Sequence, residues 1–164
     1  MAVDVYVSAG SNVAPEENLR MACRELTRRF GVLDVSGVYR NPPVGFSGAD
    51  FLNLVLRFRT AESPVTIIAE LERLHGLAGR VRGTDRFAPR TLDLDLLLYG
   101  DAVLPEAGIR VPREDILKYG FVLRPLAELA PSLRHPVTGQ TMAELWASFD
   151  QGAHPLARVG DLRL

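Results

Sequence analysis

The sequence has few of the residues that form covalent or metal cross-links. It contains one cysteine, Cys23, and three histidines that are far apart. No intramolecular disulfide can form, no thiolate cluster can hold zinc, and the histidines lack a ligand spacing such as H-x-x-x-H. Cys23 lies among helix-patterned residues, where a packing role is favoured over a reactive thiol. These absences exclude a disulfide scaffold, and we expect a protein of the reducing cytoplasm.

The chain also lacks a long apolar run and an excess of charge of one sign. No apolar segment approaches the roughly 20 residues of a membrane-spanning helix, and the N-terminus does not resemble a signal peptide. With 19 Lys and Arg against 20 Asp and Glu, the net charge is -1. We therefore expect no membrane and no nucleic-acid partner, and we expect a monomer. Any cationic site must be a local concentration of basic residues.

Two common catalytic motifs are missing. The sequence has no G-x-x-x-x-G-K-[ST], which excludes a P-loop nucleotide site. It has no G-x-S-x-G either, and no supported cysteine–histidine arrangement.

The residues that are present predict one domain over residues 1–164. The composition, 47% hydrophobic and 24% charged, is typical of a soluble globular protein. Apolar periodicity predicts strands at 3–9, 33–40, 51–60 and 91–99, and helices at 15–30, after Pro64, around 125–130 and at 141–149. Polar, Gly- and Pro-containing segments at 42–50 and 79–90 predict loops. This order predicts an α+β, ferredoxin-like sandwich with a mainly antiparallel sheet, flanking helices and C-terminal helical additions.

Two aspartates stand out in the strand 91–99. Leu92, Leu94, Leu96 and Leu98 alternate with Asp93 and Asp95, so that both carboxylates face one side. Their Cα atoms are then about 6.5–7 Å apart. Two close carboxylates in an apolar strand repel one another, and a cation such as Mg²⁺ between them removes that repulsion. The alternatives are a solvent-facing pair on an edge strand, or carboxylates paired with nearby arginines.

The loop before this strand is rich in arginine. Four arginines lie within eleven residues and are opposed only by Asp85: Arg80, Arg82, Arg86 and Arg90. One interpretation is a solvated loop. The other is a lid that grips phosphate, because guanidinium groups bind phosphate oxygens in pairs and a hinged loop can close on nucleotide. A cationic loop leading into two metal-ready carboxylates favours phosphoryl transfer.

These segments resemble a known family. Gly79-Arg-Val-Arg82, followed by Arg86-Phe-Ala-Pro-Arg-Thr-Leu-Asp-Leu-Asp95, is similar to the signature of 6-hydroxymethyl-7,8-dihydropterin pyrophosphokinases, enzymes of folate synthesis. The similarity continues in the family's order through further landmarks: Gly10-Ser-Asn12, Tyr39–Gly45, Phe51-Leu-Asn53, Val111-Pro112 and Gly120-Phe121.

The resemblance implies an activity and the roles of individual residues. It implies transfer of the β,γ-diphosphate of ATP to the hydroxymethyl oxygen of the pterin, with release of AMP. Asp93 and Asp95 would hold two Mg²⁺ ions and, with Arg80 and Arg90, form the catalytic set. The predicted ATP-binding residues are Arg80, Arg82, Arg90, Arg110, Arg113 and Tyr119. The predicted pterin-binding residues are Asn41, Pro42, Val44, Phe51, Asn53, Phe87 and Phe121.

The pterin pocket is also supported by residue chemistry. Asn53 shares a strand face with Phe51, which places an amide beside an aromatic ring, and this combination suits a flat heterocycle with alternating donors and acceptors. Core packing remains the alternative for Phe51 and Phe121. It is weaker for Asn53, because a buried amide needs a hydrogen-bond partner.

Some positions depart from the family pattern and leave alternatives open. His75 replaces an acidic residue, Phe87 a tryptophan, Arg113 a histidine and Tyr119 an arginine. The last two changes move a positive charge from 119 to 113. A non-catalytic relative that binds pterin or nucleotide is therefore a second hypothesis. A different metal-dependent phosphotransferase or nuclease is a third, and the neutral net charge argues against the nuclease.

Overall fold

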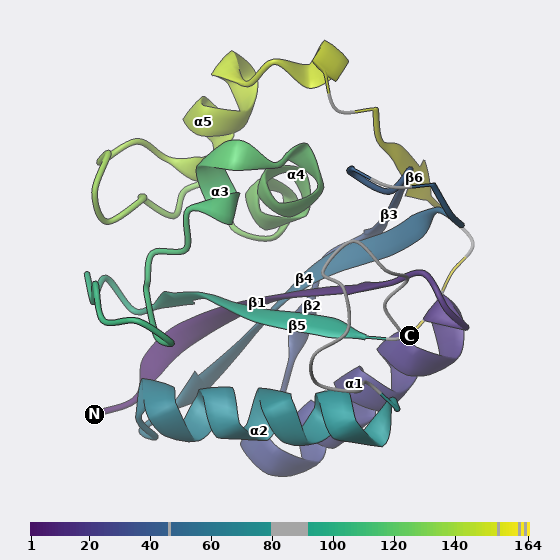
Figure 1. Ribbon diagram of the computed structural model, residues 1–164. Coiled ribbons are helices and arrows are strands. Elements are labelled where there is room, and N and C mark those ends of the chain that lie inside the picture. Colours follow the sequence, from purple (N-terminus) through teal and green to yellow (C-terminus); the bar gives the residue numbers. More distant parts are fainter. Residues whose placement is uncertain (46, 80–91, 154, 161, 163) are drawn as a thin grey trace.

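The computed structural model describes residues 1–45, 47–79, 92–153, 155–160, 162 and 164 (Figure 1). The elements in chain order are β1 Val3–Ser11, α1 Pro15–Phe30, β2 Asp34–Val35, β3 Val38–Asn41, β4 Phe51–Thr60, α2 Pro64–Leu77, β5 Asp93–Tyr99, α3 Asp115–Lys118, α4 Gly120–Leu129, α5 Met142–Ser148, the 3₁₀ helix η1 Gln151–Ala153 and β6 Ala157–Val159. None of the helices in these ranges is long and apolar enough to cross a membrane.

The strands form one open sheet in the order β5-β1-β4-β3-β6, and β2 also pairs with β4. Every strand pairing is antiparallel. Helices α1 and α2 cover one face of the sheet, and α3, α4 and α5 lie over the other (Figure 1). The predicted α+β class with a mainly antiparallel sheet, flanking helices and C-terminal helices is confirmed.

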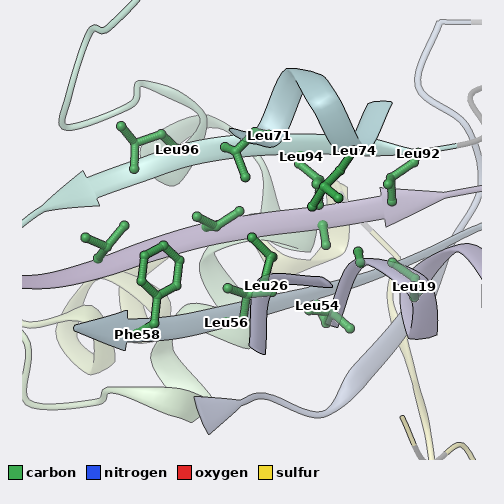
Figure 2. Close-up of a cluster of buried hydrophobic side chains, with 14 of the residues drawn as sticks. Leu19, Leu26, Leu54, Leu56, Phe58, Leu71, Leu74, Leu92, Leu94 and Leu96 are labelled. Atoms are coloured by element: carbon green, nitrogen blue, oxygen red, sulfur yellow. The ribbon is translucent and has the colours of Figure 1, made fainter. Parts of the chain in front are cut away.

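The larger core lies between the sheet and helices α1 and α2 (Figure 2). Its side chains come from the alternating positions of β1, β4 and β5 and from one stripe of each helix. On β4, Leu54, Leu56 and Phe58 are buried on this face, as the period-two pattern predicts. Each such fully buried side chain contributes roughly 1.5–3 kcal/mol. Burial also raises the pKa of the Cys23 thiol to about 11, which agrees with the packing role predicted for it.

A second core lies on the opposite face, beneath α4. Val55 of β4 packs there with Val122, Leu123 and Leu126 of α4. This helix begins at Gly120, whereas the sequence predicted a helix only from about Pro125. The helix continues through Pro125 because burying its apolar face stabilises it by more than the loss of the one hydrogen bond that Pro125 cannot donate. Helix α5 begins with a capping box between Thr141 and Glu144.

The strand predictions need three corrections. Leu98 does not share a face with Leu94 and Leu96, because the β1–β5 register shifts after Tyr6 opposite Leu98 and turns Leu98 toward the second core. The strand predicted at 33–40 is divided at Ser36, whose N–H and Oγ both bond to the backbone of Val55. Strand β1 continues to Ser11, past the predicted end at Ala9.

Strand β6 was not predicted, and a carboxylate helps to fix it. Glu128 of α4 accepts hydrogen bonds from Tyr39 Oη on β3 at 2.9 Å, from Arg158 Nε on β6 at 2.8 Å, and from the N–H of Gly37. Although burial opposes the charged form, these donors lower the pKa of Glu128. One side chain thus connects α4 to the far edge of the sheet.

The change Glu128→Ala should lower the free energy of unfolding by about 2 kcal/mol, because charge-assisted hydrogen bonds are lost and the buried Tyr39 hydroxyl loses its acceptor. Since the folded-state pKa is depressed, this stabilisation is complete at neutral pH. It should decrease as the pH falls below the ordinary carboxyl pKa of 4.5. Urea unfolding at several pH values measures the difference. Glu106→Ala, at an exposed position, is the control, and equal stability of the two variants would contradict the role of Glu128.

Candidate functional site

A cavity of about 460 Å³ lies between one end of the sheet and the α3–α4 region. It is lined by residues of β1, β3, β4 and β5, by the loop after β3, and by α3 and α4. The structure brings nine of the predicted site residues to this cavity: Asn41, Val44, Phe51, Asn53, Asp93, Asp95, Arg113, Tyr119 and Phe121.

The two aspartates share one face of β5. Asp93 lies opposite Gly10 and Asp95 opposite Ser8 of β1. Leu94, between them, is 3% exposed and belongs to the core on the far face, so the pleat turns both carboxylates toward the cavity. The register shift in β5 comes after Asp95 and leaves this arrangement unchanged.

Arg113 supplies a cation at this pair. Its Nη2 is 3.5 Å from Asp95 Oδ1, and its Nε is 3.2 Å from Asp115 Oδ2. Burial opposes the charged guanidinium, but the carboxylates of Asp95, Asp115 and Asp93 raise the pKa of Arg113. The arginine-pairing alternative left open by the sequence is thus partly realised, through an arginine that follows β5. The two aspartates thus attract the positively charged guanidinium of Arg113.

Two buried amides form the opposite side of the cavity. Asn53 of β4 is 7% exposed and donates from Nδ2 to Asn41 Oδ1, while Asn41 Nδ2 donates to the carbonyl of Pro42 at 3.0 Å. Gly10 makes room for this pair, because a Cβ at that position would lie 2.5 Å from Asn53 Oδ1. The close approach explains why a residue without a side chain stands at position 10.

Aromatic side chains complete the cavity. Phe121 stacks on Tyr119 with ring centroids 5.0 Å apart, and the Lys118 ammonium lies 5.2 Å from the Tyr119 ring. Phe121 also packs against the second core, so core packing and cavity lining both apply to it. Phe51 is half-buried at the start of β4 and lines the cavity.

The other predicted site residues fall into two groups: some do not line this cavity, and the rest lie outside the part of the chain that the structure describes. Arg80, Arg82, Phe87 and Arg90 lie outside the described residues. Pro42 is near the site through its carbonyl, and the exposed Arg110 belongs to the turn before Val111; neither lines the cavity.

Sequence reasoning missed three charged residues of the cavity: Glu114, Asp115 and Lys118. Their only sequence signal is that they follow the Val111-Pro112 landmark. Within the described ranges, no three or more His, Cys, Asp or Glu are grouped to hold a metal ion. Of the groups at the cavity, the carboxylates of Asp93 and Asp95 could hold a metal ion, and Mg²⁺ takes few protein ligands where substrate phosphates and water supply the rest.

The chain is similar to a family of known proteins. A sequence model of the 7,8-dihydro-6-hydroxymethylpterin-pyrophosphokinase (HPPK) family matches residues 6–131. The 2-amino-4-hydroxy-6-hydroxymethyldihydropteridine pyrophosphokinase of Pseudomonas aeruginosa is 38% identical over 148 residues, 88% of this chain and 90% of that protein. The enzyme of the same name from Haemophilus influenzae is 33% identical over 151 residues, 90% of this chain and 93% of that protein.

The fold recurs in a crystal structure of Plasmodium falciparum HPPK-DHPS with pteroate, at a TM-score of 0.71. That match covers 90% of this chain but 42% of the Plasmodium chain, and at 12% identity it shows the fold alone. The Pseudomonas and Haemophilus enzymes, in contrast, match over 90% and 93% of their own lengths and over 88% and 90% of this chain. The chain belongs to the 7,8-dihydro-6-hydroxymethylpterin-pyrophosphokinase family.

Proposed function

We propose that this protein transfers the diphosphate of ATP to 6-hydroxymethyl-7,8-dihydropterin in folate synthesis. The hydroxymethyl oxygen forms a bond to the β-phosphorus, the bond from that phosphorus to the oxygen shared with the α-phosphate breaks, and AMP leaves with that oxygen. The hydroxyl proton is released. The observation that carries the proposal is a single cavity with the carboxylates of Asp93 and Asp95 on one side and the amide of Asn53 on another.

The donor set fits Mg²⁺. Carboxylate oxygens are the ligands that this ion prefers, and Asp93 and Asp95 present them from one strand face. The guanidinium of Arg113 beside Asp95 supports a site whose potential favours cations. By the family resemblance we expect two Mg²⁺ ions here, which, when bound, would neutralise phosphate charge during transfer.

The protein's own groups would bind and orient the substrates. Arg113 lines the cavity and its side chain is 38% exposed, so its guanidinium can bind phosphate oxygens once its contact with Asp95 is exchanged. Asn53 can donate to and accept from the pterin edge, and the buried Asn41 holds that amide in place. Phe51 and Phe121 supply apolar surface for a flat ring. Arg80, Arg82 and Arg90 remain predicted phosphate ligands, and Phe87 a predicted pterin contact.

The finer structural predictions are also part of the proposal. The strand order β5-β1-β4-β3, with helices between β1 and β3 and between β4 and β5, supports a ferredoxin-like arrangement. We propose that residues 1–164 form one domain and that the protein acts as a cytoplasmic monomer, with no membrane or nucleic-acid partner.

The test is AMP formation by the purified protein. With ATP, Mg²⁺ and the reduced pterin alcohol together, we expect AMP and the pterin diphosphate in equal amounts, measured by chromatography. Omitting the pterin or chelating Mg²⁺ should stop AMP formation. Calorimetry with the same ligands separates the alternatives. Binding without AMP would show a non-catalytic pterin- or nucleotide-binding protein. AMP formed without pterin would mean that water accepts the diphosphate, which would show a different metal-dependent activity.

A further inference from the structure

The outer edge of β5 has no strand partner among the residues that the structure describes. β5 is the last strand of the sheet and pairs with β1 alone. Alternate backbone N–H and C=O groups of such a strand point away from the sheet, and when buried they need another partner. In this protein that partner matters, because the same strand carries Asp93 and Asp95.

A histidine of α2 supplies one partner. His75 is 4% exposed, and its Nε2 accepts the backbone N–H of Leu94 at 2.8 Å. A ring nitrogen that accepts a hydrogen bond carries no proton, so the proton of the neutral ring is on Nδ1. Glu72 Oε1 lies 3.3 Å from that Nδ1. The negative charge of Glu72 favours a proton on Nδ1 of His75, and the neutral ring then keeps the Nε2 lone pair that accepts the Leu94 N–H.

The amide that His75 holds is in the peptide joining Asp93 to Leu94. Its position sets the pleat by which β5 turns the carboxylates before and after Leu94 toward the cavity. Further along the same edge, the N–H of Arg113 donates to the carbonyl of Leu97 at 2.9 Å. The free edge of β5 is therefore held at two points, and His75 is the side chain at the point nearest both aspartates.

We propose that His75 is a positioning residue, which sets the geometry of Asp93 and Asp95 for a divalent cation through the backbone of Leu94. The inference rests on the proposed function for the identity of the cation. It also explains how a histidine serves at a position where an acidic residue was expected: the role needs a hydrogen-bond acceptor, which an imidazole provides. His75 itself does not line the cavity.

Two amide substitutions at position 75 test this role. In His75→Gln the amide lies about as far along the side chain as Nε2 and can still accept from Leu94. In His75→Asn the amide ends one methylene short. Ile67→Ala is the matched control, because Ile67 is fully buried on the same helix, two turns earlier, and its loss weakens helix packing without removing the contact to Leu94.

The first measurement is hydrogen exchange of the Leu94 amide by NMR. We expect exchange at least about tenfold faster in His75→Asn than in a control of equal stability, and near-original exchange in His75→Gln. The second is calorimetry of Mg²⁺ with a non-hydrolysable ATP analogue. Here His75→Asn should weaken the apparent Mg²⁺ affinity about tenfold, the usual lower bound for losing an outer support of a metal site. Pterin affinity should stay unchanged.

Equal Leu94 exchange and equal Mg²⁺ affinity in His75→Asn and Ile67→Ala would overturn the inference and leave His75 a packing residue. Failure of His75→Gln to restore either quantity would also count against it. If the unaltered protein formed no AMP, the proposed function would fail. The exchange and calorimetry measurements, which need no turnover, would still decide whether His75 positions a cation site.

Discussion

Replacing Asp95 by alanine should lower the turnover number of diphosphate transfer by about 10³-fold or more. Metal-based charge stabilisation contributes several kcal/mol to such reactions, and about 1.4 kcal/mol corresponds to a factor of ten. Asp95 faces the cavity from β5, and with Asp93 it supplies the pair of carboxylates proposed to bind the cation. Loss of one carboxylate should therefore remove most of the stabilisation of charge in the transition state.

The fold should tolerate this change. Asp95 contributes to no apolar core, and its side chain is 26% exposed beside Arg113. A partly exposed ion pair of this kind contributes about 1 kcal/mol or less, and removing it also relieves repulsion with Asp93. The buried Leu94 and Leu96 on the other face keep β5 in the sheet. We expect the melting temperature to change by only a few degrees.

AMP formation at saturating substrates measures the effect, with thermal unfolding measured in parallel. Asp101→Ala is the control, since Asp101 is an exposed aspartate in the turn after the same strand and does not line the cavity. It should keep normal turnover. If Asp95→Ala retained near-normal turnover in a folded protein, Asp95 would have no place in the mechanism.

The strand of the aspartates shows how far one sequence can predict a site. Alternation of Leu92, Leu94 and Leu96 with two aspartates is a local pattern, and burial of the leucines alone settles which way the carboxylates face. The face of Leu98 was predicted wrongly because the register shift depends on how β5 pairs with β1. The sequence of either strand alone does not specify that pairing. Local periodicity therefore predicts faces well until a bulge intervenes.

Contacts between distant segments were beyond the sequence argument. The sequence identified Asn41 and Asn53 as separate candidates, but their hydrogen bond arises from the pairing of β3 with β4. The same limit hid the link from His75 to Leu94, which needs the packing of α2 on β5. In each case the residue type gave a signal, whereas its partner depended on the tertiary arrangement.

The departures from the family pattern become partly intelligible. The sequence suggested that positive charge had moved from position 119 to 113. In the structure Arg113 lies at the cavity beside Asp95, while Tyr119 stacks on Phe121 in the cavity wall. A positive charge therefore lies near the carboxylates at position 113, and position 119, where the family has an arginine, carries an aromatic ring. The position of Arg113 at the cavity fits its proposed role at the phosphates.

The second large effect is expected from the smallest change, Gly10→Ala. A Cβ at position 10 would lie 2.5 Å from Asn53 Oδ1, and the buried amide has little room to withdraw because Asn41 holds it. A displaced amide would leave polar groups of the pterin unpaired, at a cost of roughly 1–3 kcal/mol. We therefore expect the KM for the pterin to rise about 10- to 100-fold. Binding of a non-hydrolysable ATP analogue should change little.

A double-mutant cycle separates this clash from a general loss of fold. Once Asn53→Ala has removed the amide, adding Gly10→Ala should cost almost nothing further, so the two effects on pterin KM should be far from additive. Gly76→Ala is the matched control: no described atom lies within 4 Å of its added Cβ, and it should leave KM unchanged while stabilising α2 by about 0.5–1 kcal/mol. Additive effects of Gly10→Ala and Asn53→Ala would show that the two residues act independently. The expected clash between the new Cβ and the Asn53 amide would then not explain the change in pterin KM.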